Sequence, residues 1–200
     1  MKKETKKIEV EILTGIHIGG GNDAVQIGGV DSAVIKDPIS ALPYIPGSTL
    51  KGKIRCLLET EGRYSEKDDI INAYFGPTSE YIKLKKDDKE YTQKPTRIIF
   101  RDLSLSKEDE EKFKNGEITT EFKTEIVIDR SKGTAKDGGL RSIERVPPSV
   151  KFSGELLIRY NNGELDDIIK VLNEGIDLLN NDYLGGSGSR GYGAVKVTLS

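Results

Sequence analysis

Residues 150–199 read VKFSGELLIRYNNGELDDIIKVLNEGIDLLNNDYLGGSGSRGYGAVKVTL. Apolar and polar side chains alternate over residues 150–160, and this period predicts a strand. Over residues 165–179 the apolar residues recur at helical spacing, which predicts an amphipathic helix. A glycine-rich stretch then leads to residues 194–199, AVKVTL, which predict a closing strand. The chain is therefore expected to end as strand, helix, strand.

The first half of the chain predicts the matching elements. Alternation over residues 8–12 predicts a strand that ends at Thr14 and Gly15. A helix is expected to begin with Ser48 as its N-cap, and its apolar face is formed by Leu50, Ile54, Leu57 and Leu58. Residues 97–105, RIIFRDLSL, have the composition of a strand. The order strand, helix, strand, strand, helix, strand matches an α+β fold with a ferredoxin-like (RRM-like) βαββαβ core.

Two stretches are expected to be insertions within a single domain that covers residues 1–200. The core is assigned to about residues 7–60, 96–105 and 150–200. Residues 61–95 predict a helical and charged insertion, with a short helix around residues 70–75 and a solvated loop over residues 83–90. Residues 106–149 lie between the second and third core strands and predict a thumb-like hairpin with a glycine-rich tip.

Composition excludes several classes of protein. Hydrophobic residues make up 35% of the chain and charged residues 32%, and no apolar stretch approaches the roughly 20 residues that cross a bilayer. No membrane association is expected, and the cytoplasm is the expected location. Cys56 and His17 are the only cysteine and histidine, which excludes a disulfide framework and the usual zinc sites within one chain. Cys56, beside Leu57 and Leu58, is expected to be buried. The net charge of −2 means that any nucleic acid must be held by local clusters.

A glycine-rich loop is the first such cluster. Residues 185–193 contain five glycines around Arg190. The backbone amides near Gly186 and Gly188 could approach a phosphate that the guanidinium grips, and an arginine between glycines has no evident packing role. The alternative is a flexible turn into the last strand.

The helix that follows Ser48 offers a second cationic cluster. At 100° per residue, Lys51 and Arg55 share one flank of its apolar stripe and Lys53 lies on the other. Near the N-terminus of a helix these cations could bind an anion. A solvated helix flank is the alternative.

Two aspartates lie in residues 30–38, VDSAVIKDP. A carboxylate there could bind a metal or orient a water or hydroxyl. Asp37 precedes a proline and is expected to be a turn residue. Asp31 is the candidate, with an exposed and inert loop aspartate as the alternative. His17, in a turn flanked by glycines, is either a structural histidine or one that contacts a ligand.

Several blocks together carry a family resemblance. They are TGIHIGGG (14–21), GGVDSAVIKDP (28–38), LPYIPGSTLKGKIR (42–55), VIDRSKGTA (127–135), LRSIERVPP (140–148) and DYLGGSGSRGYGAV (182–195). In this order the chain resembles the backbone subunit of type III-A (Csm-type) CRISPR effector complexes, in the RAMP superfamily. The resemblance implies a ferredoxin-like core with a projecting thumb, copies of which stack along a guide RNA.

The resemblance also implies an activity and its residues. By motif position, Asp31 is the loop aspartate that promotes cleavage of the target RNA with a divalent metal, magnesium or manganese, and is itself a candidate metal ligand. The positions that match guide-RNA contacts are His17, Lys51, Lys53, Arg55, Arg130, Gly186, Gly188 and Arg190. The implied partners are guide RNA, single-stranded target RNA, further copies of the chain and other subunits of the complex.

Two other functions stay open from the sequence. One is a structural RNA scaffold in which Asp31 is inert. The other is a metal-independent nuclease of the same superfamily that processes the guide, and the thumb-like insertion argues against it.

Overall fold

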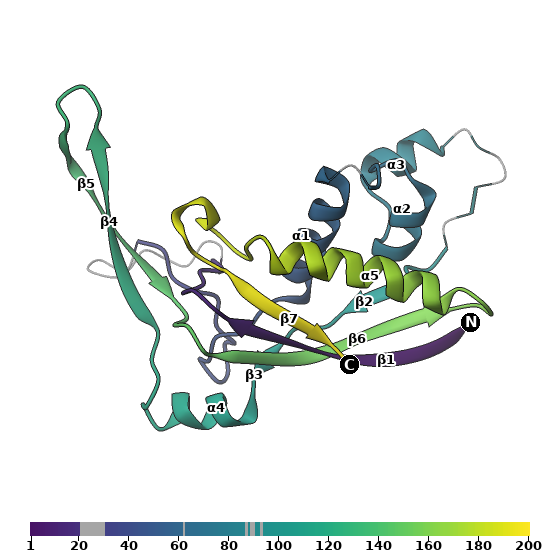
Figure 1. The fold of residues 1–200 in the computed structure, drawn as a ribbon, viewed down its shortest axis with the longest axis horizontal. Coiled ribbons are helices and arrows are strands. Elements are labelled where there is room, and N and C mark those ends of the chain that lie inside the picture. Colours follow the sequence, from purple (N-terminus) through teal and green to yellow (C-terminus); the bar gives the residue numbers. More distant parts are fainter. Residues whose placement is uncertain (21–30, 62, 87, 89–90, 93) are drawn as a thin grey trace.

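The main sheet is antiparallel and has β1 at its centre (Figure 1). The computed structural model describes residues 1–20, 31–61, 63–86, 88, 91–92 and 94–200. β1 (Lys2–Ile12) pairs with β6 (Lys151–Tyr160) on one side and with β7 (Val195–Leu199) on the other. β2 (Ile98–Phe100) and β3 (Ser104–Leu105) both pair with β6. The strand order is β2-β6-β1-β7, with β3 beside β6.

Two long helices cover one face of this sheet. α1 (Gly47–Thr60) and α5 (Leu165–Asn180) pack against each other and against the sheet (Figure 1). Alternation in β1 turns Ile8, Val10 and Ile12 toward the helices, where all three are buried, and turns Glu9 toward solvent. The apolar stripe of α5 is buried as its period predicts. The expected mixed α/β architecture with antiparallel strands is thus confirmed.

The start of α1 differs from the prediction. The helix begins at Gly47, and no side chain caps it, so the assignment of Ser48 as N-cap is wrong. Instead, the Gly47 amide donates to Asp102 Oδ1 at 2.8 Å. Asp102 lies between β2 and β3, and the single strand predicted over residues 97–105 is therefore two strands in the structure.

Cys56 is exposed, and its predicted burial is wrong. Cys56 follows the buried Ile54 by two positions. At 100° per residue, its side chain therefore points about 200° around the helix from that of Ile54, away from the sheet.

Two short helices form the insertion after α1. α2 (Asp69–Phe75) confirms the helix expected around residues 70–75. α3 spans Ser79–Leu84 and so includes Lys83. The prediction that a loop begins at Lys83 is therefore wrong. Residues 87 and 89–90 of that charged stretch lie outside the described residues, as do residues 21–30 of the glycine-dense segment after β1.

A long hairpin projects from the rest of the molecule (Figure 1). α4 (Lys107–Lys114) precedes it, and β4 (Glu121–Asp129) pairs with β5 (Thr134–Arg145) as a separate two-stranded sheet. α4 was not predicted, although Ser106 caps it by accepting from the Asp109 amide at 3.2 Å. None of the described helices is both long and apolar enough to cross a membrane.

Candidate functional site at the base of the hairpin

Asp31 lies against the hairpin. Its Oδ2 accepts a hydrogen bond from the Ser142 amide of β5 at 2.7 Å, and the residue is exposed. The next residue, Ser32, bridges to Ile143, and its carbonyl accepts from the Glu144 amide at 2.9 Å. The segment that carries Asp31 therefore runs along β5, and one carboxylate oxygen has a fixed position.

Glu144 fixes the residues that follow Asp31. Its side chain is buried, and its carboxylate accepts from the Val34 amide at 3.0 Å, Lys36 Nζ at 2.7 Å and Thr120 Oγ1 at 2.6 Å. Burial raises the pKa of Glu144, but the hydrogen bonds from Lys36, Thr120 and Val34 outweigh it and leave the pKa below its ordinary value. Sequence reasoning did not single out this residue.

His17 joins three segments of the site. Its Nδ1 lies 2.7 Å from the Glu144 carbonyl oxygen, which can only accept, so Nδ1 carries a proton. Its Nε2 lies 3.0 Å from Ser32 Oγ, and its own carbonyl accepts from the Gly186 amide at 2.9 Å. Both ring nitrogens therefore have partners within the chain. This favours a structural role for His17 over contact with a ligand. The structure does bring His17, Asp31 and the glycine-rich loop together.

The glycines of this loop allow close packing. A Cβ at Gly188 would overlap the Tyr183 ring, and one at Gly185 would overlap the His17 carbonyl. The sequence predicted that the Gly186 amide could bind a phosphate. In the structure this amide donates to the His17 carbonyl, so it is not free to do so. The 3-10 turn η1 (Gly188–Arg190) follows.

Arg190 connects this loop to the hairpin. Its Nε lies 3.2 Å from Glu125 Oε2 on β4, and its Nη2 donates to Ser187 Oγ. The expectation that this arginine has no packing role is therefore wrong. Its side chain nevertheless keeps 48% of its surface exposed, so it can still contact an anion.

Tyr192 completes the connection between loop and hairpin. The centre of its buried ring lies 4.4 Å from Lys123 Nζ and 4.7 Å from Arg145 Cζ, and both are cation–π distances. Its hydroxyl donates to Glu125 Oε1 at 2.8 Å. The base of the hairpin is thus held by aromatic and ionic contacts together.

The three predicted cations of α1 have different surroundings. Arg55 binds Glu59 at 2.8 Å, the Gly76 carbonyl at 2.5 Å and Asn72 Oδ1 at 3.2 Å, so it ties α1 to α2. Lys53 Nζ lies 2.6 Å from Asp182 and 3.9 Å from the centre of the Tyr183 ring.

Lys51 has no carboxylate partner among the residues that the structure describes. Burial and the neighbouring Arg55 charge lower the pKa of its ammonium group. Of the three cations, Lys51 is therefore the one most open to a new anion. Arg130 lies elsewhere, in the turn after β4 at the far end of the hairpin.

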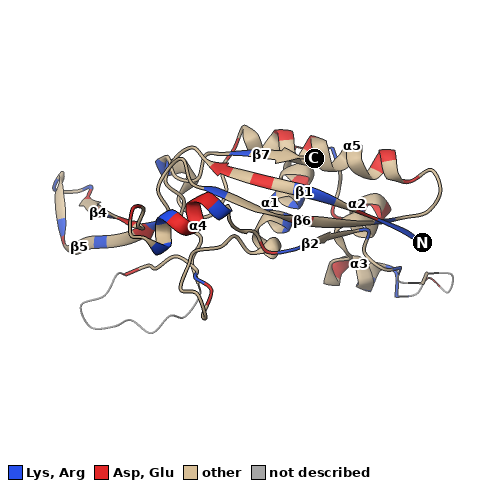
Figure 2. Cartoon of the chain, turned by 90° about the horizontal axis from the view of Figure 1, so that it is seen from below, with Lys and Arg blue, Asp and Glu red and all other residues tan. Residues whose placement is uncertain are grey.

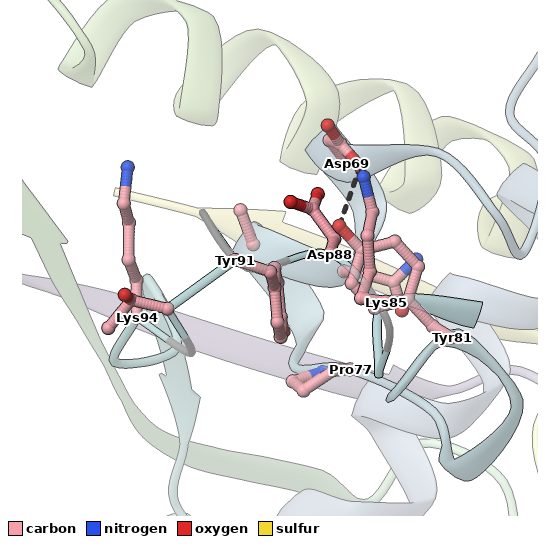
Figure 3. Close-up of a pocket in the computed structure, with 10 residues that line it drawn as sticks. Asp69, Pro77, Tyr81, Lys85, Asp88, Tyr91 and Lys94 are labelled. Carbon is pink, nitrogen blue, oxygen red and sulfur yellow. Dashed lines mark hydrogen bonds and ion pairs between the residues drawn. The ribbon is translucent and has the colours of Figure 1, made fainter. Parts of the chain in front are cut away.

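A separate cavity of about 290 Å³ lies between α2, α3 and the segment after them (Figure 3). Tyr81 donates to Asp69 at 2.6 Å, and Lys85 lies 3.1 Å from the same carboxylate. Burial and the bond to Asp69 raise the pKa of Tyr81 far above its ordinary value. None of the predicted site residues lines this cavity, which belongs to the insertion rather than to the hairpin base.

The described residues contain no cluster of three or more histidine, cysteine, aspartate or glutamate side chains that could hold a metal ion. A protein-only metal site of that size is therefore absent from the described part of the chain. Asp31 offers a single carboxylate.

The chain matches a known protein family and named members of it. The family model described as the RAMP superfamily matches residues 9–196. A protein of Methanocaldococcus jannaschii named CRISPR system Cms endoribonuclease Csm3 is 41% identical over 192 residues, which cover 94% of this chain and 75% of that protein. The Streptococcus thermophilus protein of the same name is 40% identical over 196 residues, covering 94% and 83%.

Solved structures agree in fold. A chain of the Csm3–Csm4 subcomplex of the type III-A CRISPR-Cas interference complex has a TM-score of 0.54 and 28% identity, and the match covers 100% of this chain and 77% of that one. A chain of the type III-B Cmr-beta complex bound to cognate target RNA has a TM-score of 0.68 at 16% identity, covering 98% and 97%. The second likeness concerns the fold alone.

Proposed function

Since the chain belongs to the RAMP superfamily and, within it, to the Csm3 endoribonucleases, we propose that it is the guide-RNA-binding backbone subunit of a type III CRISPR ribonucleoprotein and cleaves the RNA paired to that guide. The observation that carries the proposal is the exposed Asp31 carboxylate held on the Ser142 amide at the base of a projecting hairpin. Its partners would be guide RNA, target RNA, further copies of itself and other subunits. The cytoplasmic location expected from the sequence is part of this proposal.

The fold supports a ferredoxin-like core with a thumb as its finer description. The core elements follow the order β1, α1, β2, β6, α5, β7. In the sheet order β2-β6-β1-β7, the first core strand, β1, lies beside the third, β6. The hairpin leaves between β3 and β6, where the thumb is expected.

The surface of the hairpin suits a wedge between paired strands of RNA. Ile126 and Leu140 lie opposite each other in the register and are 52% and 65% exposed. Phe122 and Ile128 add further exposed apolar surface. Exposed apolar patches of this kind mark binding surfaces, and unstacked bases offer a matching apolar face.

The reaction that fits this site is attack by a 2′-hydroxyl oxygen on the adjacent phosphorus of the target. The new bond joins that oxygen to phosphorus, and the bond to the 5′-oxygen breaks. The two oxygens must lie in line, which a nucleotide displaced from the helical stack can achieve. Asp31 would orient the attacking 2′-hydroxyl or hold a metal ion, because the Ser142 amide fixes its Oδ2 and no hydrogen bond to Oδ1 is found among the described residues.

A divalent metal fits this site only together with RNA. Magnesium is commonly held by one or two carboxylates and the phosphates of its substrate, and Asp31 can supply one such ligand. When bound there, the ion would stabilise negative charge on the phosphate.

Reconstitution tests the function directly. The complex, assembled with a guide RNA of known sequence, should cut a labelled complementary RNA in magnesium or manganese and leave an unrelated RNA intact. Chelation by EDTA should stop cleavage without releasing the target. Binding without any cleavage in either metal would instead identify a scaffold, and full cleavage in EDTA would refute the metal requirement.

A further inference from the structure

Arg190 is held along one edge of its guanidinium group. Its Nε lies 3.2 Å from Glu125 Oε2 on β4, and its Nη2 donates to Ser187 Oγ. Nε and Nη2 form the lateral edge of this planar group, so both partners lie on the same side of it. Among the described residues, no hydrogen bond or ion pair to Nη1 is found. The end of the group, formed by Nη1 and the second proton of Nη2, is therefore free to donate to another acceptor.

This free end suits a phosphate. The Arg190 side chain keeps 48% of its surface exposed, whereas the Glu125 side chain keeps 12%. Glu125 thus lies on the covered side of the guanidinium group, and a ligand can approach from the solvent side. An arginine can direct two parallel N–H bonds at the oxygens of one phosphate, and this pair of bonds depends on the direction in which the guanidinium plane is held.

Glu125 is itself fixed at the base of the hairpin. Its Oε1 accepts from the Tyr192 hydroxyl at 2.8 Å, and the buried Tyr192 ring is held in turn by Lys123 and Arg145. Burial raises the pKa of Glu125, but the bond from Tyr192 and the neighbouring Arg190 charge outweigh it and leave the pKa below its ordinary value. The two carboxylate oxygens therefore have separate tasks, one toward Tyr192 and one toward Arg190.

The surroundings of Glu125 make two possible roles distinguishable. Basic positions, blue in Figure 2, occur along the hairpin of β4 and β5, and the charges of Lys123, Arg141 and Arg190 all act on this carboxylate. If Glu125 acted on RNA through its charge alone, it would repel phosphates, and removing the charge would strengthen binding. If Glu125 instead orients Arg190, removing it lets the guanidinium group turn away and weakens binding.

We propose that Glu125 is a positioning residue for RNA: it orients Arg190 so that the free end of the guanidinium group meets a phosphate of the RNA backbone. The inference rests on the proposed function, in which the chain binds RNA. Because Glu125 belongs to the hairpin and Arg190 to the glycine-rich loop, this contact also links the two. The loop then holds its phosphate only while the base of the hairpin is docked against it.

Binding of a labelled oligouridylate to the full chain at several salt concentrations tests the proposal. Glu125→Gln keeps the size of the side chain, but only one of its two terminal atoms can accept, so it cannot accept from both Arg190 and Tyr192. Binding should weaken by about three- to tenfold. The slope of log K against log salt should become shallower by about 0.7, the value for one phosphate contact on a single strand.

Two further variants complete the test. Glu125→Asp keeps the charge but shortens the side chain by one methylene, so it should also weaken binding, and it takes the place of Glu125→Gln if that variant does not fold. Asp137→Asn removes a charge from an exposed position of β5 in the same hairpin and is the matched control. It should bind RNA at least as tightly as the parent.

The Arg190→Gln background decides whether Glu125 acts through Arg190. In that background, Glu125→Gln should cause no further loss of binding. Equal or tighter binding by Glu125→Gln in the parent, or the same loss in both backgrounds, would overturn the positioning role. If the parent itself binds no RNA at low salt, the proposed function fails, and this inference fails with it.

Discussion

Glu144 lies in β5 next to Ile143, and its carboxylate is the point to which Val34, Lys36 and Thr120 are attached. Those partners come from the chain segment after Asp31 and from the approach to β4. The residue is therefore a structural support for the segment that carries Asp31. Nothing in its own neighbourhood in the sequence indicates this role, because two of its partners are 108 and 110 positions away.

Glu144→Gln should lower the free energy of unfolding by about 2 kcal/mol, because a buried charge-assisted network loses its charge. The pKa of Glu144 is lower in the folded chain than its ordinary value of 4.5, so its contribution to stability is present above that pH and is lost as the pH falls below it. Chemical denaturation between about pH 3 and pH 7 measures both effects.

The variant should show a flatter loss of stability in acid than the parent. Glu155→Gln, at an exposed position of β6, is the control and should change stability by no more than about 0.5 kcal/mol. Parallel acid profiles for the parent and the Glu144 variant would contradict the role given to this carboxylate.

At the scale of elements, the period of the apolar residues predicted both long helices and the long strands of the main sheet. The ends of elements were less predictable, because they depend on distant residues. The first amide of α1 donates to Asp102, which is 55 positions away, and the adjacent Ser48 does not cap the helix. The hairpin was expected from its glycine-rich tip, whereas α4 was missed because its charged sequence has no apolar stripe.

Two glycines of α1 and α5 test how these helices pack, because alanine at one should destabilise the fold and at the other should stabilise it. A Cβ at Gly175 of α5 would lie 2.5 Å from Ile54 Cγ2, so Gly175→Ala should destabilise the fold by about 1–3 kcal/mol through overpacking. Gly52 of α1 has nothing within 4 Å of such a Cβ. Gly52→Ala should therefore stabilise the fold by about 0.5–1 kcal/mol, because alanine favours the helix. Thermal unfolding of both variants measures the two effects, and the same sign for both would refute the packing argument.

At the scale of the whole molecule, the hairpin and the core are separate structures joined at one base. The core strands bury their apolar side chains under α1 and α5, whereas Phe122, Ile126 and Leu140 of the hairpin remain exposed. The sequence predicted the site residues one by one, and His17, Asp31 and Gly186 do meet at this base. The distant partners of Arg55 and Arg190 were not predictable, since Gly76 and Glu125 are reached only through the tertiary fold.

Shortening the hairpin should separate folding from function. Ile126 and Leu140 are paired in the register, so an Asn-Gly turn can join them in place of residues 127–139. The shortened protein should melt within about 3 °C of the parent, because no buried core residue is removed. Its complex should bind guide RNA but cut paired target at least about tenfold more slowly. Loss of the folded state would show instead that the hairpin stabilises the core.

The catalytic role of Asp31 is tested most directly by Asp31→Asn in the reconstituted complex. Asparagine can still accept from the Ser142 amide, so the hydrogen bond is kept while the charge is removed. Asp37→Asn is the matched control, because the Asp37 carboxylate accepts from Ile39 and Ser40 of its own turn and from no other residue in the described ranges. Target cleavage should fall on the order of 10²-fold or more in the Asp31 variant and stay at the parental rate in the control, with guide binding and target pairing unchanged in both. Cleavage at the parental rate by the Asp31 variant would contradict the catalytic assignment and favour an RNA scaffold.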